Sequence, residues 1–175
     1  GKIIGGGFPV GAVGGREPVM SVFSRLSARG WPKVYQGGTF TANPITMAAG
    51  LRALELLTSD AFARLDQQGD RLRTGLRRAA ERAGLPVQVY GDASLTGVAI
   101  CREPFDSYRE MVRACGPAHK AALLTFHREM LNGGVLVGPG GVFVGSTPMT
   151  DADIDATVAA AEGAFAVLAR TAAAA

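Results

Sequence analysis

Cysteine and histidine are both scarce in this sequence, and their scarcity argues against a disulfide-stabilised scaffold and against a metal-binding domain. The 175 residues include two cysteines, Cys101 and Cys115, and two histidines, His119 and His127. Two cysteines are too few for a disulfide scaffold, and the spacing of these side chains matches no common metal-ligand pattern. We therefore expect reduced thiols in a cytoplasmic protein, with both histidines in structural roles.

Long apolar runs and concentrated charge are also lacking. No apolar run approaches the ~20 residues of a membrane helix, so we expect no membrane-spanning segment. The net charge is only +3, and the one dense group of arginines is interleaved with Asp66, Asp70 and Glu81. These arginines are Arg71, Arg73, Arg77, Arg78 and Arg82. The mixture of signs favours a solvated helix face over a nucleic-acid surface, so we expect no nucleic-acid partner.

Lysine is the third scarce residue type, with three lysines against fifteen arginines. Lysine can lose its proton when desolvated and then act as a nucleophile, whereas arginine stays charged. A lysine in so arginine-rich a chain is therefore a candidate for chemistry that arginine cannot perform. Lys2 lies beside a glycine-rich stretch, which leaves space for a ligand. Composition alone nevertheless favours the alternative, a surface lysine near the end of the chain.

Glycine is abundant and gathers in the first fifteen residues, which read GKIIGGGFPVGAVGG. The run Gly5–Gly7 loses much backbone entropy on folding, so it indicates a tight turn or a backbone contact too close for a Cβ atom. We predict turns and a short strand over residues 1–15. A short helix is predicted next, from Glu17 to Leu26.

A second glycine-containing stretch, YQGGTFTANPITMAAG at residues 35–50, leads into a predicted helix. Asn43 suits the N-cap position and Pro44 the first helical position, and the helical pattern continues to about Leu57. The backbone N–H of Gly38 and the hydroxyl of Thr39, just ahead of this helix, could hold a phosphate. The spacing alone favours an ordinary capped loop, because it matches no Walker pattern.

The rest of the chain alternates helix and strand signals. A long amphipathic helix is predicted from Ser59 to Ala83, ended by Gly84, and a final helix is predicted after the capping residue Thr150. Between them we predict a helix at His119–Leu131 and strands at Val87–Tyr90, Gly97–Cys101, Val135–Val137 and Val142–Val144. This pattern predicts an α/β fold in which helices cover small sheets, with a domain boundary near residue 60.

Both glycine-rich stretches resemble segments of a known enzyme family. GKIIGGGFPVGAVGG is similar to the lysine segment of the class III (fold type I) pyridoxal-phosphate aminotransferases. YQGGTFTANPITMAAG is similar to the next motif of that family, at the expected separation. Within the family, the chain looks most like the glutamate-1-semialdehyde 2,1-aminomutases. A weaker resemblance continues to about Phe165, so it covers nearly the whole chain.

The resemblance implies a cofactor site with assigned roles. Lys2 matches the lysine that forms a Schiff base with pyridoxal 5′-phosphate and then shuttles protons at the substrate carbon. Gly38 and Thr39 match residues that donate hydrogen bonds to the cofactor phosphate. In this family the threonine reaches the site of the neighbouring subunit. The resemblance therefore implies a homodimer that acts on a small amino, keto or semialdehyde substrate.

The resemblance also implies that these residues form the carboxy-terminal portion of a longer enzyme. Residues 1–59 would complete the large cofactor-binding domain, and residues 60–175 would supply the connecting helix and the small α/β domain. The family's aspartate, ring-stacking aromatic residue and phosphate loop all precede the lysine. We therefore expect those parts outside these 175 residues.

The region in which the aminomutases carry an acidic, aromatic stretch departs from their pattern. It ends in PGGVFVGSTPMT, with no carboxylate before Asp151, and no arginine lies between Arg128 and Arg170. Three hypotheses therefore stay open. They are an aminomutase that shifts an amino group within one molecule, an aminotransferase for a β- or ω-amino acid, and a non-catalytic fragment that keeps the family fold.

Overall fold

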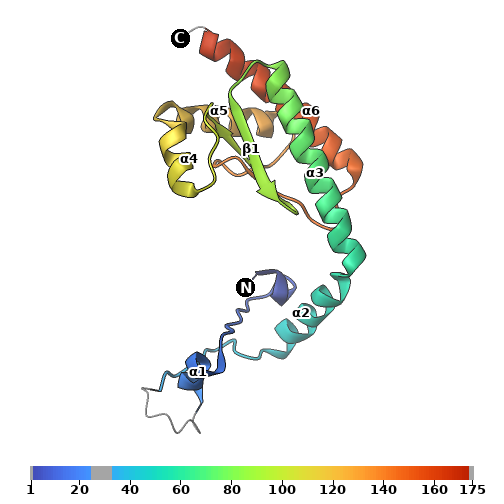
Figure 1. Ribbon diagram of the computed structural model, residues 1–175. Helices are drawn as coiled ribbons and strands as arrows, with labels where there is room; N and C mark the ends of the chain where they lie inside the picture. Colours follow the sequence, from blue (N-terminus) through green and yellow to red (C-terminus); the bar gives the residue numbers. More distant parts are fainter. Residues whose placement is uncertain (1, 25–32, 174–175) are drawn as a thin grey trace. The chain divides into compact units, whose positions relative to one another are not determined.

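The structure is a computed structural model that describes residues 2–24 and 33–173, with the backbone alone at Lys2 (Figure 1). The chain divides into two compact units, Gly1–Ser59 and Asp60–Ala175. We call them unit 1 and unit 2 and describe each by itself.

Unit 1 contains short helical segments joined by extended chain. They are the 3-10 turn η1 (Lys2–Gly5), α1 (Glu17–Met20), the 3-10 turn η2 (Ser21–Phe23) and α2 (Pro44–Leu56). The prediction of a short strand within residues 1–15 is wrong. Among the described residues of this stretch, Lys2–Gly5 form η1 and none belongs to the sheet. A helix was predicted from Glu17 to Leu26. The α-helix α1 ends at Met20, and the chain continues as the 3-10 turn η2 to Phe23. The last two residues of the predicted helix lie outside the described residues.

Helix α2 forms as the sequence predicts. The Asn43 side-chain oxygen accepts hydrogen bonds from the N–H groups of Ile45 and Thr46 at 3.0 and 3.2 Å. Pro44 lies in the first turn of the helix, where a backbone N–H would have no carbonyl within the helix to bond with, so the lack of an N–H in proline costs nothing there. The cap sets the residue at which α2 begins, and so it also sets where the preceding segment, which contains Gly38 and Thr39, meets the helix.

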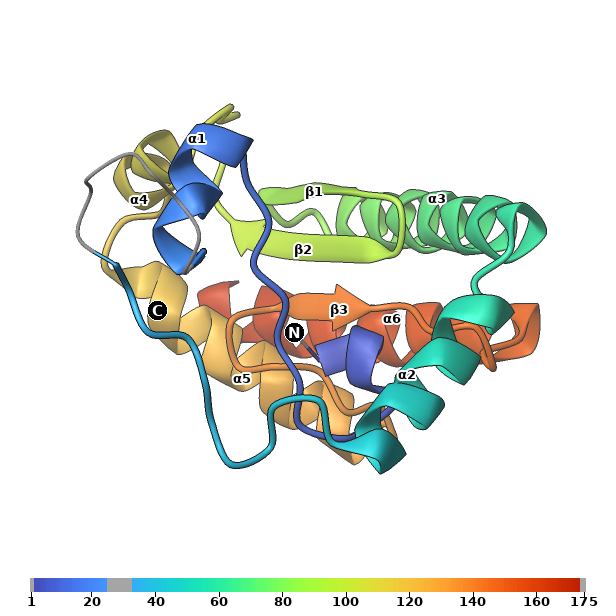
Figure 2. The ribbon, with the colours of Figure 1, turned by 90° about the horizontal axis from the view of Figure 1, so that it is seen from below.

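Unit 2 contains the remaining elements, and its antiparallel sheet runs in the order β1-β2-β3 (Figure 2). The helices are α3 (Ser59–Arg82), α4 (Tyr108–Cys115), α5 (Ala118–Asn132) and α6 (Asp151–Ala173). The strands are β1 (Val87–Asp92), β2 (Leu95–Ile100) and β3 (Val142–Val144). Leu95 pairs with Asp92 on one side and with Val144 on the other, so β2 is the central strand.

The core of unit 2 lies between the sheet and helices α3, α5 and α6. Phe126 of α5 stacks on Phe165 of α6, with ring centroids 5.0 Å apart, and both are fully buried. Leu76 of α3 and Val98 of β2 complete the centre of the same cluster. The predicted cap of the last helix is confirmed, since the Asp153 N–H donates to the Thr150 hydroxyl at 3.4 Å and the Thr150 N–H donates to the Asp153 carboxylate at 2.7 Å.

Two sequence-based assignments in unit 2 need correction. Residues 135–137 were expected to form a strand, but they run as irregular chain. The Val137 carbonyl lies 2.7 Å from Nδ1 of His127, so a side chain takes the place of a strand partner. Helix α4 was also missed from the sequence, although Tyr108, Met111, Val112 and Cys115 repeat at helical spacing and Ser107 caps the helix.

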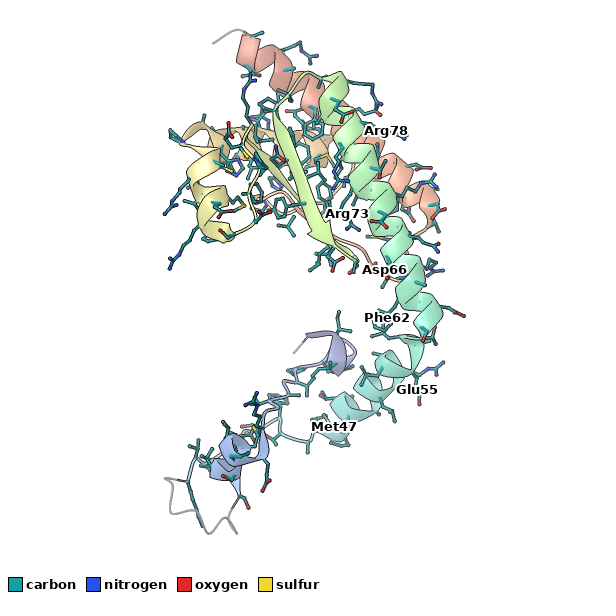
Figure 3. All side chains as sticks on the ribbon, in the orientation of Figure 1. Met47, Glu55, Phe62, Asp66, Arg73 and Arg78 are labelled. Atoms are coloured by element: carbon teal, nitrogen blue, oxygen red, sulfur yellow. The ribbon has the colours of Figure 1, made fainter. Side chains whose placement is uncertain are left out.

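The arginine group on α3 is only partly solvated, which corrects the expectation of a solvated face. Arg71 pairs with Asp155 at 2.7 Å, and Arg82 pairs with Glu162, so both tie α3 to α6. Arg73 is buried and donates to the carbonyl oxygens of Ala93 and Leu95, at the turn between β1 and β2 (Figure 3). These three arginines help to hold unit 2 together, and the absence of a nucleic-acid partner stays a prediction from the sequence.

Unit 2 is expected to fold on its own, whereas unit 1 is not. Among the described residues of unit 1, only Gly5, Thr46 and Gly50 are buried, so little apolar area leaves water there. A fragment of residues 60–175 should unfold in one cooperative thermal transition, measured by circular dichroism. A fragment of residues 1–59 should show no transition. A cooperative transition in the shorter fragment, or its absence in the longer one, would contradict this division.

Candidate functional site

Lys2 lies at the start of a tight turn. The Gly6 N–H donates to the Ile3 carbonyl at 3.0 Å, and the Phe8 N–H donates to the Gly5 carbonyl at the same distance. Gly6 and Gly7 have φ values of 57° and 93°, which other residues rarely adopt. The glycine run therefore reverses the chain directly after η1. The Lys2 side chain lies outside the described atoms, so the turn locates only its backbone.

The turn that carries Lys2 packs directly on helix α2. A Cβ atom at Gly50 would overlap the carbonyl oxygen of Ile4, and one at Gly6 would overlap the carbonyl of Ala49. The two backbones therefore touch without intervening side chains, as the glycine run suggested. This contact sets the position of the turn along α2.

The segment ahead of α2 forms a second turn that holds Gly38 and Thr39. The Thr41 N–H donates to the Gly38 carbonyl at 3.0 Å, and the Asn43 N–H donates to the Phe40 carbonyl at 3.2 Å. Ala42 has a φ of 55°, an uncommon conformation for alanine. Backbone strain from such a positive φ is concentrated at functional sites in proteins. No sequence pattern predicted a positive φ at Ala42.

The hydrogen-bond donors at this turn are the ones that the sequence analysis named. Gly38 and Thr39 are exposed, and their N–H groups and the Thr39 hydroxyl make no hydrogen bond within the described part of the chain. Asn43 already occupies the N–H groups of Ile45 and Thr46, so these donors of α2 are taken. The donors that an anion could reach here therefore belong to the turn in front of the helix.

Two adjoining hollows connect the two turns within unit 1. One, of about 820 Å³, is lined by residues 9–13 on one side and by residues 38–42 on the other. The second, of about 640 Å³, is lined by Ile3, Gly7 and Phe8, and it shares Pro9 and Val10 with the first. The lining of both hollows is mostly apolar.

In unit 2, the segment before α6 is held by helix α3. The Gln68 side-chain nitrogen donates to the Met149 carbonyl at 3.0 Å, and Arg64 donates to the Thr147 carbonyl. The Gly145 N–H donates to the Ser94 carbonyl at 2.8 Å. The first carboxylate after this segment belongs to Asp151. The segment therefore offers backbone and hydroxyl groups, but no acidic side chain, to a substrate.

The two histidines have structural partners, as the sequence analysis proposed. Nδ1 of His119 accepts a hydrogen bond from the Ile100 N–H at 3.2 Å, and burial lowers the pKa of this imidazole. His127 contacts the Val137 carbonyl. In the part of the chain that the structure describes, no group of His, Cys, Asp and Glu side chains could hold a metal ion. Nor does any described helix have the length and hydropathy needed to cross a bilayer.

Comparison with known proteins identifies the family. Residues 1–163 match the family described as Aminotransferase class-III. Glutamate-1-semialdehyde 2,1-aminomutase 1 of Bacillus cereus (strain G9842) is 39% identical over 165 residues, which is 93% of this chain and 36% of that protein. The chain therefore spans just over a third of the length of the curated relatives it matches.

Solved structures agree with the family match. The ω-transaminase from Sphaerobacter thermophilus is 40% identical with a TM-score of 0.85, over 95% of this chain and 37% of that one. A transaminase with PLP bound is 32% identical with a TM-score of 0.79, over 97% of this chain and 38% of that one. The expected fold, part of a fold type I PLP-transferase, is thereby confirmed. Since the family match covers residues 1–163, the chain belongs to the class III aminotransferases.

Proposed function

We propose that this chain forms part of an enzyme that transfers amino groups with pyridoxal 5′-phosphate. The observation that carries the proposal is the packing of the Lys2 turn on α2, in a chain that belongs to the class III aminotransferases. This packing fixes the position of the backbone turn that carries Lys2 along α2.

The residues present fit this cofactor. The cofactor, when bound, supplies an electron sink for the substrate's amino-bearing carbon. Lys2 would hold the cofactor covalently through its amine, and that amine would later take a proton from the substrate carbon and return it. The Thr39 hydroxyl and the N–H of Gly38 would donate to the phosphate, since both face solvent and lack partners among the described residues.

The proposal includes a homodimer in which Thr39 serves the neighbouring subunit's site. The surface around Thr39 is consistent with a protein contact, because Tyr35, Phe40 and Ile45 are 86%, 61% and 63% exposed. Exposed apolar side chains gathered in one region commonly mark an interaction surface. A cytoplasmic location and the absence of a nucleic-acid partner remain predictions from the sequence.

Two substrate classes remain candidates. The first is the glutamate-1-semialdehyde aminomutase reaction, supported by 39% identity to the Bacillus cereus enzyme. The second is transfer between a β- or ω-amino acid and a keto acid, supported by 40% identity to the ω-transaminase. The absence of a carboxylate in residues 138–150 weakens the first candidate, and the absence of an arginine between Arg128 and Arg170 weakens the second, so both stay open.

An assay of the natural protein separates these candidates. An aminomutase converts glutamate-1-semialdehyde without any added amino acceptor, whereas an aminotransferase produces a new amino acid only when a keto acid is supplied with an amine donor. We expect one of these two activities to be present. If neither substrate set reacts with protein that has been loaded with cofactor, the proposed function is wrong and a non-catalytic role stands.

Replacing Thr39 with valine should weaken cofactor binding by about 10- to 150-fold, because a hydrogen bond to a charged phosphate contributes about 1.5–3 kcal/mol. The measurement is a titration of the cofactor-free natural protein, followed by absorbance. Thr39→Ser keeps the hydroxyl and should restore the affinity. If Thr39→Val bound as tightly as the parent, the assignment of Thr39 to the phosphate would be excluded.

A further inference from the structure

The two cysteines of the chain are brought together in unit 2. Cys101 directly follows β2, Cys115 is the last residue of α4, and α4 packs against β2. Cys115 raises the pKa of Cys101, through a hydrogen bond between the side chains and through its charge, so the two sulfurs lie close together. The Cys101 thiol also donates to the Glu103 carbonyl at 3.6 Å.

One aromatic side chain, that of Tyr90, lies beside the pair. Burial raises the pKa of the Tyr90 phenol, and negative charge on Cys115 and on Cys101 raises it further, so Tyr90 lies close to both sulfurs. The ring of Tyr90 meets that of Phe105 edge-on, with centroids 5.2 Å apart. A small oxidant can reach such a site more readily than a bulky one.

We infer that Cys101 and Cys115 form an intramolecular disulfide when the protein meets a peroxide. The overall reaction joins the two sulfurs, removes both thiol hydrogens and reduces one hydrogen peroxide to two waters. The oxidant is the peroxide, and the two thiols supply the two electrons. This modification site does not depend on the proposed function.

The two thiols differ in reactivity, and this sets the order of the steps. Cys101 is only 5% exposed, and burial, followed by the hydrogen bond and the charge of Cys115, raises its pKa to about 11. Cys115 is half-buried and therefore meets the peroxide first. Its thiolate attacks one peroxide oxygen, the O–O bond breaks, and a sulfenic acid forms with loss of hydroxide. The Cys101 sulfur then attacks the Cys115 sulfur, and the S–O bond breaks to release water.

Helix α4 can make the small movement that bond formation requires. The sulfurs must approach to about 2.05 Å, which is closer than a hydrogen bond. No residue of α4 is buried, so the helix is held by few apolar contacts. The following Gly116 has a φ of 59° and no atom near the position of a Cβ, which leaves room for adjustment at the end of the helix.

Peptide mapping of the whole chain tests the inference. The protein is treated with hydrogen peroxide, its free thiols are alkylated, and it is digested with trypsin. Cleavage after Arg82, Arg102, Arg113 and Lys120 places Cys101 in peptide 83–102 and Cys115 in peptide 114–120. We expect these peptides to become linked, at least about tenfold above the untreated protein, and to separate on reduction.

Two variants serve as controls. In Cys115→Ser, the buried Cys101 should remain a free thiol after the same treatment. In Cys101→Ala, Cys115 should stop at the sulfenic acid, which dimedone traps. Three results in the parent protein would contradict the inference. They are a dimedone adduct on Cys115 with Cys101 still a free thiol, no modification of either thiol, and a disulfide between two chains instead of within one. If Cys101→Ala does not fold, the parent and Cys115→Ser still decide the matter.

Discussion

Replacing Gly50 with alanine is expected to lower the rate of amino-group transfer by about 100-fold, because a misplacement of about 1 Å at a reacting group costs that much. The added methyl group would overlap the carbonyl oxygen of Ile4, which is backbone and cannot rotate away. The η1 turn would therefore move off α2 and take Lys2 with it. The measurement is kcat of the natural protein, with cofactor binding followed in parallel.

A matched control for this prediction lies in α6. Gly163 is also within a helix, but no atom lies within 4 Å of the position of its Cβ. Gly163→Ala should leave kcat unchanged and should raise the thermal midpoint slightly, since alanine favours a helix by about 1 kcal/mol over glycine. If Gly50→Ala kept full activity, the turn on α2 would not be what positions Lys2.

Replacing Arg73 with alanine is expected to lower the free energy of unfolding of unit 2 by about 3 kcal/mol. The Arg73 guanidinium donates to the carbonyls of Ala93 and Leu95 at 2.9 and 3.1 Å, and to the Thr96 hydroxyl at 3.3 Å. Removing it leaves the buried Thr96 hydroxyl and two partly buried carbonyls without this donor, and a buried group left without its partner costs about 1–3 kcal/mol. Urea unfolding of the 60–175 fragment measures the change.

Arg78 provides the comparison on the same helix (Figure 3). It is exposed, and it makes no hydrogen bond or ion pair within the part of the chain that is described. Arg78→Ala should therefore change the stability by less than about 0.5 kcal/mol. Equal effects of the two substitutions would show that Arg73 does not hold the β1–β2 turn to α3.

The contrast between Arg73 and Arg78 shows that a local sequence pattern cannot predict contacts between residues far apart in the chain. The pattern predicted one solvated arginine face on α3, because adjacent charges of both signs usually face water. Arg73 instead reaches the turn at Ala93, twenty residues along the chain. Only the pairing of β1 with β2 brings that turn beside α3, and no local pattern contains this information.

Local signals predicted the capped helices well. Asn43 and Thr150 mark the starts of α2 and α6, because a cap is a contact between residues two or three positions apart. Helix α4 was missed although its local signals are present. The Glu110 N–H donates to the Ser107 hydroxyl at 3.3 Å, and apolar residues repeat along the helix at helical spacing. The strand expected at residues 135–137 failed because His127 contacts the Val137 carbonyl.

The candidate site was found by resemblance rather than by spacing. Composition favoured a surface role for Lys2, and the spacing around Thr39 favoured an ordinary loop. The structure adds what neither could show, which is the backbone contact between Gly50 and Ile4 and the left-handed conformation of Ala42. Both depend on how distant parts of unit 1 pack.

The exposed surface of unit 1 agrees with the lengths of the relatives. Its described residues form no apolar core, and the chain spans just over a third of the proteins it matches. Ile45, Leu51 and Leu54 along α2 are each about half exposed or more. We therefore expect activity assays to require the natural protein rather than unit 1 or unit 2 alone.

The most direct test of the central claim is to identify the residue that holds the cofactor covalently. The natural protein, loaded with pyridoxal 5′-phosphate, is reduced with borohydride and digested with trypsin. We predict loss of the visible absorbance band and a cofactor-labelled peptide that runs uncleaved through Lys2 to Arg16, because trypsin does not cut at a modified lysine. A label on Lys33 or Lys120, or no label at all, would contradict the assignment of Lys2.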